Sequence, residues 1–159
     1  MRVVDGVVGN VEDDPDLAAA ADRHREADTL ERLVLDETER RRSRFRGETD
    51  AGTSLGIVVG DGPLLAGDVL VADEDRFVVV ALADRAAFAV DFAAGTAPVE
   101  AAAFGHALGN RHWSFAVRAG TGYVAAGSDP EGRRTRLERL LPEGATIQST
   151  TVQPGVFDA

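Results

Sequence analysis

Residues 98–127, "PVEAAAFGHALGNRHWSFAVRAGTGYVAAG", decide the fold of the second half of this chain. The alanine-rich part predicts a helix over residues 98–109, because proline suits the first helical turn and alanine the helix interior. Residues 112–127 alternate in character on either side of Gly120 and Gly122 and predict a hairpin of two strands. A helix followed directly by a hairpin is the centre of a βαββαβ unit.

The flanking segments complete this unit. "AAFAVDFA" (86–93) predicts the first strand, and Thr96 is a possible helix cap just before Pro98. "DPEGRRTRLERLLPEG" (129–144) predicts a second helix that begins at Asp129–Pro130, and residues 145–152 predict the last strand. The βαββαβ order predicts a ferredoxin-like domain over residues 86–159, with four antiparallel strands and two helices on one face.

Residues 1–85 predict a separate, mostly β domain, so the fold class is α+β with two domains. A helix is expected to begin at Asp14–Pro15 in an acidic, alanine-rich stretch. His24 lies on this polar stretch, and we expect a solvated surface histidine. The period-2 spacing of Arg42, Arg44 and Arg46 predicts an edge strand with one basic face.

Composition narrows the classes of function. The net charge is −10, and all 17 basic residues are arginine, which fits either a salt-adapted organism or a GC-rich genome. This acidity argues against nucleic acid as the main partner. With no cysteine, no membrane-length apolar run and no signal peptide, the sequence predicts a cytoplasmic protein without thiolate metal sites or membrane contacts. No nucleophile elbow or phosphate-binding loop is present, so we expect a protein that is not an enzyme.

The segment "RRRSRFRG" (40–47) is the one basic island in this acidic chain. It could bind an acidic protein surface, bind RNA, or simply protect a sheet edge from aggregation. A protein contact is favoured over RNA because the segment is short and no aromatic residue lies on either side of it. Arg42, Arg44 and Arg46 are therefore candidate docking residues for a partner.

His106 and His112 are six residues apart, which on one helix separates them by about 9 Å along the axis and about 120° around it. Ligand nitrogens must lie about 2.0–2.1 Å from a metal ion, so the two imidazoles cannot meet on one ion in that geometry. Gly109–Asn110 predicts the helix end, with one of them in the left-handed conformation. His112 is then either a structural histidine or a ligand that meets its own copy across a dimer axis.

"LGNRH" (108–112) after an alanine-rich helix, together with residues 40–70, resembles the urease accessory metallochaperone family of the UreE type, and the match runs over residues 30–152. The resemblance implies an Hsp40-like substrate-binding β domain (1–85) and a ferredoxin-like metal-binding domain (86–159). It implies a homodimer in which His112 binds Ni(II), with Cu(II) or Zn(II) as possible substitutes in vitro.

The same resemblance implies delivery of the metal through a partner GTPase to the urease apoenzyme. Residues 123–129 and the C-terminal tail hold no histidine, where many relatives carry further ones, and no role transfers to His106. The alternative is a metal-free module that binds peptides, in which the histidines are structural.

Overall fold

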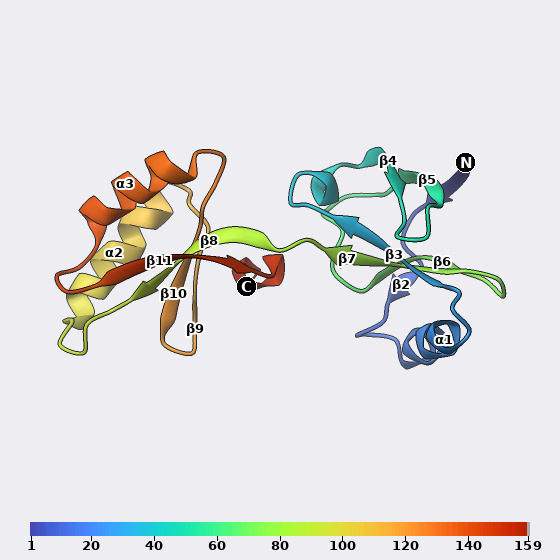
Figure 1. The fold of residues 1–159 in the computed structure, drawn as a ribbon, viewed down its shortest axis with the longest axis horizontal. Coiled ribbons are helices and arrows are strands. Elements are labelled where there is room, and N and C mark those ends of the chain that lie inside the picture. Colours follow the sequence, from blue (N-terminus) through green and yellow to red (C-terminus); the bar gives the residue numbers. More distant parts are fainter. Residues whose placement is uncertain (159) are drawn as a thin grey trace. The chain divides into compact units, whose positions relative to one another are not determined.

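The computed structural model describes residues 1–158, which fold as two compact units, the first Met1–Ala83 and the second beginning at Asp84. Within the described residues the protein is α+β, mostly strand, with three α-helices (Figure 1). Each unit has its own hydrophobic core. The sequence placed the boundary after residue 85, two residues beyond the end of the first unit.

The first unit contains two sheets and one α-helix. One sheet has the order β1-β5-β4 and the other the order β2-β6-β7-β3. The pairs β1–β5 and β3–β7 are parallel, and the remaining pairs are antiparallel. The elements are β1 (Arg2–Asp5), β2 (Gly9–Asn10), α1 (Pro15–Glu26), β3 (Leu30–Leu35), β4 (Arg44–Glu48), β5 (Ser54–Val58), β6 (Asp68–Ala72) and β7 (Phe77–Leu82), with a 3₁₀ turn, η1, at Glu39–Arg41.

The main core of this unit joins both sheets. Strand β3 alternates, so that Leu33 and Leu35 are buried while Val34 between them is exposed. These leucines pack in one cluster with Leu55 and Ile57 of the other sheet. The two sheets therefore stabilise each other across a shared apolar layer.

Helix α1 begins where the sequence predicts. The Asp14 carboxylate accepts hydrogen bonds from the backbone N–H groups of Asp16 and Leu17, and Pro15 occupies the first helical turn. Ala21 is buried in a small separate cluster with Val69 and Phe77. This packing attaches α1 to the second sheet.

The second unit has the element order strand, helix, strand, strand, helix, strand. Its sheet has the order β11-β8-β10-β9, and every pair is antiparallel. Both helices cover one face (Figure 1), where Phe104, Leu108 and Leu137 join one core with the strands. The elements are β8 (Arg85–Asp91), α2 (Pro98–Asn110), β9 (Phe115–Arg118), β10 (Thr121–Ala125), α3 (Pro130–Leu140) and β11 (Thr146–Val152), followed by a 3₁₀ turn, η2, at Pro154–Phe157.

The start of α2 corrects one expectation. The residue before the helix is Ala97, which makes no side-chain cap, and Pro98 alone marks the first turn. The Thr96 hydroxyl oxygen is buried without a hydrogen-bond partner among residues 1–158, so Thr96 is not the cap. The predicted start of the second helix at Asp129–Pro130 is confirmed, because the Asp129 carboxylate accepts a hydrogen bond from the Gly132 N–H at the start of α3.

Candidate functional site

His112 lies in the turn that ends helix α2. Its φ angle is 55°, in the left-handed region that side chains other than glycine adopt rarely. The His112 N–H donates to the Gly109 carbonyl at 3.0 Å, and the Trp113 N–H donates to the Leu108 carbonyl at 3.2 Å. These two bonds form a Schellman motif, with His112 at the position where glycine is usual.

This turn corrects the predicted helix end. Gly109 and Asn110 are both inside α2, and His112 itself is the left-handed residue. The shift follows from packing, because Leu108 is fully buried and Trp113 packs against the same core on the other side of the turn. A hydrophobic contact between these two positions is typical of the motif and fixes where the helix can stop.

The His112 side chain is exposed, and no hydrogen bond to its imidazole links it to another residue in the described chain. Both ring nitrogens are therefore available to a ligand. A side chain in a sparsely populated backbone conformation costs of order 1–3 kcal/mol and persists where its surroundings determine it. Here the two backbone bonds and the buried flanking residues do so, and they hold the imidazole at a defined point on the surface.

His106 is also exposed, one turn before the end of α2, and it has a partner within the helix. Its Nε2 lies 3.2 Å from the Asn110 Nδ2, which donates to it. Within residues 1–158, no three His, Asp or Glu side chains form a group that could hold a metal ion.

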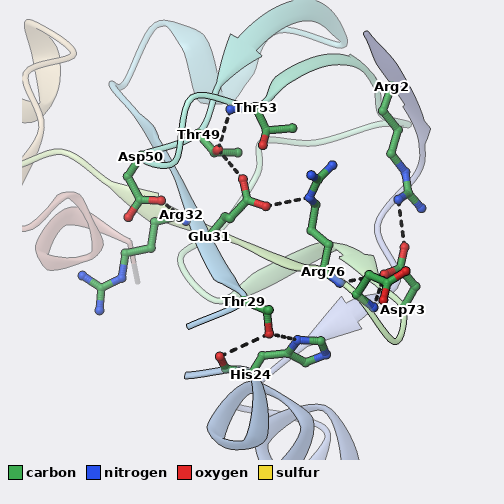
Figure 2. A network of polar contacts seen from close by, with 11 residues as sticks. Arg2, His24, Thr29, Glu31, Arg32, Thr49, Asp50, Thr53, Asp73 and Arg76 are labelled. Atoms are coloured by element: carbon green, nitrogen blue, oxygen red, sulfur yellow. Dashed lines mark hydrogen bonds and ion pairs between the residues drawn. The ribbon is translucent and has the colours of Figure 1, made fainter. Parts of the chain in front are cut away.

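His24 differs from the expected solvated histidine. It is half-buried, and its Nδ1 lies 2.7 Å from the Thr29 hydroxyl (Figure 2). The His24 ring lies 5.4 Å from the ring of Phe77. It lines a pocket of about 530 Å³ between α1 and the turn that joins β6 to β7. The polar sequence around His24 did not reveal that Phe77, more than fifty residues later, packs against it.

Glu31 of the first unit is a buried carboxylate that the sequence did not single out. Glu31 accepts from the Thr49 hydroxyl at 2.6 Å and pairs with the Arg76 Nε at 2.6 Å (Figure 2). Burial raises the pKa of Glu31, but hydrogen bonds from Thr49 and Thr53 and the charge of Arg76 outweigh it and hold the pKa below the ordinary 4.5. The network ties β3 to the 49–53 turn and to Arg76, beside β7.

The basic strand is shorter than predicted. Arg44 and Arg46 are exposed on β4, which lies at the edge of its sheet as expected, but Arg42 lies before the strand, at the end of η1. The strand starts later than predicted because Arg40, which is 1% exposed, is buried in the turn before it. Its guanidinium is held by the Glu37 carboxylate at 2.6 Å and by the Leu64 carbonyl at 3.3 Å, and this anchors a turn where the pattern suggested extended chain.

Comparison with known proteins gives the family. The sequence model described as "UreE urease accessory protein, N-terminal domain" matches residues 4–83. A urease accessory protein UreE of Natronomonas pharaonis is 45% identical over 159 residues, which cover 99% of this chain and 74% of that protein. The chain belongs to the UreE family.

Bacterial UreE proteins match less closely. The relatives from Yersinia aldovae and Yersinia pestis are 36% and 33% identical over 133 residues, which cover 78% of this chain. The chain spans just over half of the length of these Yersinia proteins, 56% in each case. UreE proteins are accessory metallochaperones rather than enzymes, so the expectation of a non-enzyme is confirmed by the family. No helix in residues 1–158 has the length and apolar character to cross a membrane.

Proposed function

We propose that this UreE-family protein is a cytoplasmic nickel carrier that acts as a homodimer, with His112 of each copy binding one shared Ni(II). The observation that carries the proposal is the conformation of His112, an exposed imidazole without a hydrogen-bond partner among residues 1–158, held in a left-handed turn that favours glycine. A histidine kept at a strained position points to a function of its side chain.

A dimer supplies the second ligand that one chain lacks. In a symmetric dimer a residue near the two-fold axis meets its own copy, so one histidine per chain becomes two at one ion. Two imidazoles with few other strong ligands give a moderate affinity, which suits a carrier that must release its metal. Cu(II) binds such ligands more tightly than Ni(II), and Zn(II) also accepts imidazole, so selectivity depends on the supply of metal and on the partner.

The two units are proposed to have different roles, metal binding and dimerisation in one and partner binding in the other. The order β11-β8-β10-β9, with helices on one face, supports a ferredoxin-like domain for metal binding and dimerisation in residues 86–159. The β-rich residues 1–85 are proposed to be an Hsp40-like domain that binds partner proteins. Because its relatives are named urease accessory proteins, we propose a urease accessory GTPase and the urease apoenzyme as partners.

The exposed edge of β4 is the proposed docking surface in the first unit. Arg44 and Arg46 lie on β4, the edge strand of its sheet, and Arg42 follows η1 directly before it. Such a strand can pair with an extended segment of a partner while the arginines attract acidic side chains. The same edge supports the alternative function, a metal-free module that binds peptides.

Calorimetric titration with Ni(II) separates the two functions. The proposal expects about one Ni(II) per dimer for the wild type and loss of this binding in His112→Ala. His106→Ala is the matched control, since it removes a second exposed histidine of the same unit and should leave nickel affinity unchanged. Undiminished binding by His112→Ala would refute the metal site, and no stoichiometric binding by the wild type would leave the peptide-binding module as the better account.

A further inference from the structure

A group of arginines surrounds Trp113, the residue that follows His112. The central guanidinium carbon of Arg133 lies 4.7 Å from the centre of the Trp113 ring, and that of Arg111 lies 5.8 Å from it. Arg136 lies three residues after Arg133 on α3, a spacing that puts the two side chains on neighbouring positions of the helix surface. We call Arg111, Trp113, Arg133 and Arg136 the Trp113 cluster. Cations over an indole face form favourable contacts, so the ring gathers these charges at one place.

Arg133 is fixed in the cluster by the backbone around it. Its guanidinium donates to the Ala125 carbonyl at 2.8 Å. Gly127 has a φ of 71°, and a Cβ on this residue would lie 2.6 Å from the central guanidinium carbon of Arg133. The backbone conformation therefore favours glycine here, and a larger residue would also require the Arg133 guanidinium to move.

The positive charges of the cluster lack counterions. Among residues 1–158, no carboxylate forms an ion pair with Arg111, Arg133 or Arg136. Burial lowers the pKa of Arg133, and the charges of Arg136 and Arg85 lower it further. Arg111 and Arg136 are exposed. Like charges held together without a counterion repel one another, and an anionic ligand would relieve that repulsion.

The distribution of charge differs between the two units of this chain. Residues 1–83 hold 19 of the 27 acidic side chains and 10 of the 17 arginines, whereas residues 84–159 hold eight acidic side chains and seven arginines. Four of those seven arginines are on α3, at positions 133, 134, 136 and 139. The second unit is thus nearly neutral overall, and α3 is a basic helix, with four arginines against two glutamates.

We propose that the Trp113 cluster is a docking surface for an acidic segment of a partner protein. Carboxylates of the segment would pair with the exposed Arg111 and Arg136, and its apolar groups would pack on the open part of Trp113. A protein segment is favoured over nucleic acid because a chain of net charge −10 repels a long polyphosphate, whereas a short segment needs only two or three contacts. Arg111 and Trp113 are the neighbours of His112 in the sequence, so a partner docked here would lie near the proposed nickel ligand. That role in metal transfer rests on the function proposed above, whereas docking itself requires no metal.

The test is fluorescence anisotropy with a fluorescein-labelled hexaglutamate peptide and metal-free protein at low ionic strength. The double variant Arg111→Glu/Arg136→Glu should bind at least about tenfold more weakly than the wild type, because two attractions become repulsions. Arg134→Glu is the matched control on the same helix, since Arg134 is already paired with Glu138, and it should lose less than the double variant.

Three outcomes would overturn the proposal. They are no binding of hexaglutamate to the wild type, equal losses in the double variant and in the control, and tighter binding of a labelled hexanucleotide RNA than of the peptide. Circular dichroism of each variant would establish that it is folded. Because the measurement uses no nickel, its result is independent of whether His112 binds metal.

Discussion

Replacing His112 by glycine should stabilise the protein while abolishing nickel binding. An L-residue in the left-handed region costs roughly 1–2 kcal/mol, and the middle of this range, about 1.5 kcal/mol, is taken for His112. Glycine removes this cost but loses about 0.5–1 kcal/mol more conformational entropy on folding. The expected net gain for His112→Gly is about 0.5–1 kcal/mol, because the exposed imidazole makes no hydrogen bond within residues 1–158 that would be lost with it.

The gain converts to a melting temperature through the size of the unit. Unfolding entropy is about 2.1 cal/mol/K per residue, so the C-terminal unit, residues 84–159, unfolds with about 160 cal/mol/K. A gain of about 0.5–1 kcal/mol therefore raises its melting temperature by about 3–6 °C. Differential scanning calorimetry of metal-free protein, at one fixed concentration so that any dimer contributes equally, measures this shift.

His112→Ala is the control that separates the two effects. Alanine removes the imidazole but keeps the left-handed strain, so it should lose nickel without gaining stability. A melting temperature for His112→Gly equal to or below that of the wild type would refute the claim that His112 is strained. Nickel binding of full strength in His112→Gly would refute the claim that the strained side chain holds the metal.

Three further predictions concern other sites. Replacing Glu31 with glutamine should destabilise the first unit by roughly 1–3 kcal/mol at neutral pH, measured by urea denaturation, because it weakens a buried charged network. The pKa of Glu31 is lowered in the folded state, so the ionised carboxylate contributes fully to the free energy of unfolding above the ordinary pKa of 4.5. This contribution is lost as the pH falls through the lowered pKa, so the stabilities of the wild type and the variant should converge in acid. A constant difference between them from about pH 7 to about pH 3 would contradict this. Nickel affinity should fall when the pH is lowered from about 8 to about 5.5, since protons compete with the metal for imidazole nitrogen, and an affinity that does not change would exclude histidine as the main ligand. Gly127→Ala should displace Arg133, lower stability by about 1 kcal/mol or more and weaken binding of the acidic peptide, whereas unchanged values would show that Gly127 does not position Arg133.

The elements of the second unit could be predicted because their signals are local. Pro98, Asp129 and Pro130 lie at helix starts, and the alternation around Gly120 and Gly122 identifies the hairpin. Each signal depends on the conformational preference of a residue or of its immediate neighbours. The start of α1 at Asp14–Pro15 could be predicted for the same reason.

The errors concern positions that distant residues determine. The end of α2 depends on the burial of Leu108 and Trp113, which overrides the preference of Gly109 and Asn110 for a helix end. Arg40 is buried because Glu37 and the Leu64 carbonyl satisfy it, and a basic run gives no sign of such a partner. The candidate residue His112 could be selected from the sequence, but its left-handed conformation could not.

The two parallel strand pairs of the first unit have a consequence for synthesis on the ribosome. Strand β1 pairs with β5, more than fifty residues later, and β3 pairs with β7, which ends at Leu82. Neither sheet can be completed until its later partner has left the exit tunnel, and the last partner ends one residue before the unit does. At about 5–20 residues per second the nascent chain keeps β1 and β3 unpaired for several seconds. During that time Leu33 and Leu35 are exposed, so we expect nascent chains to need protection from aggregation until the whole first unit has emerged.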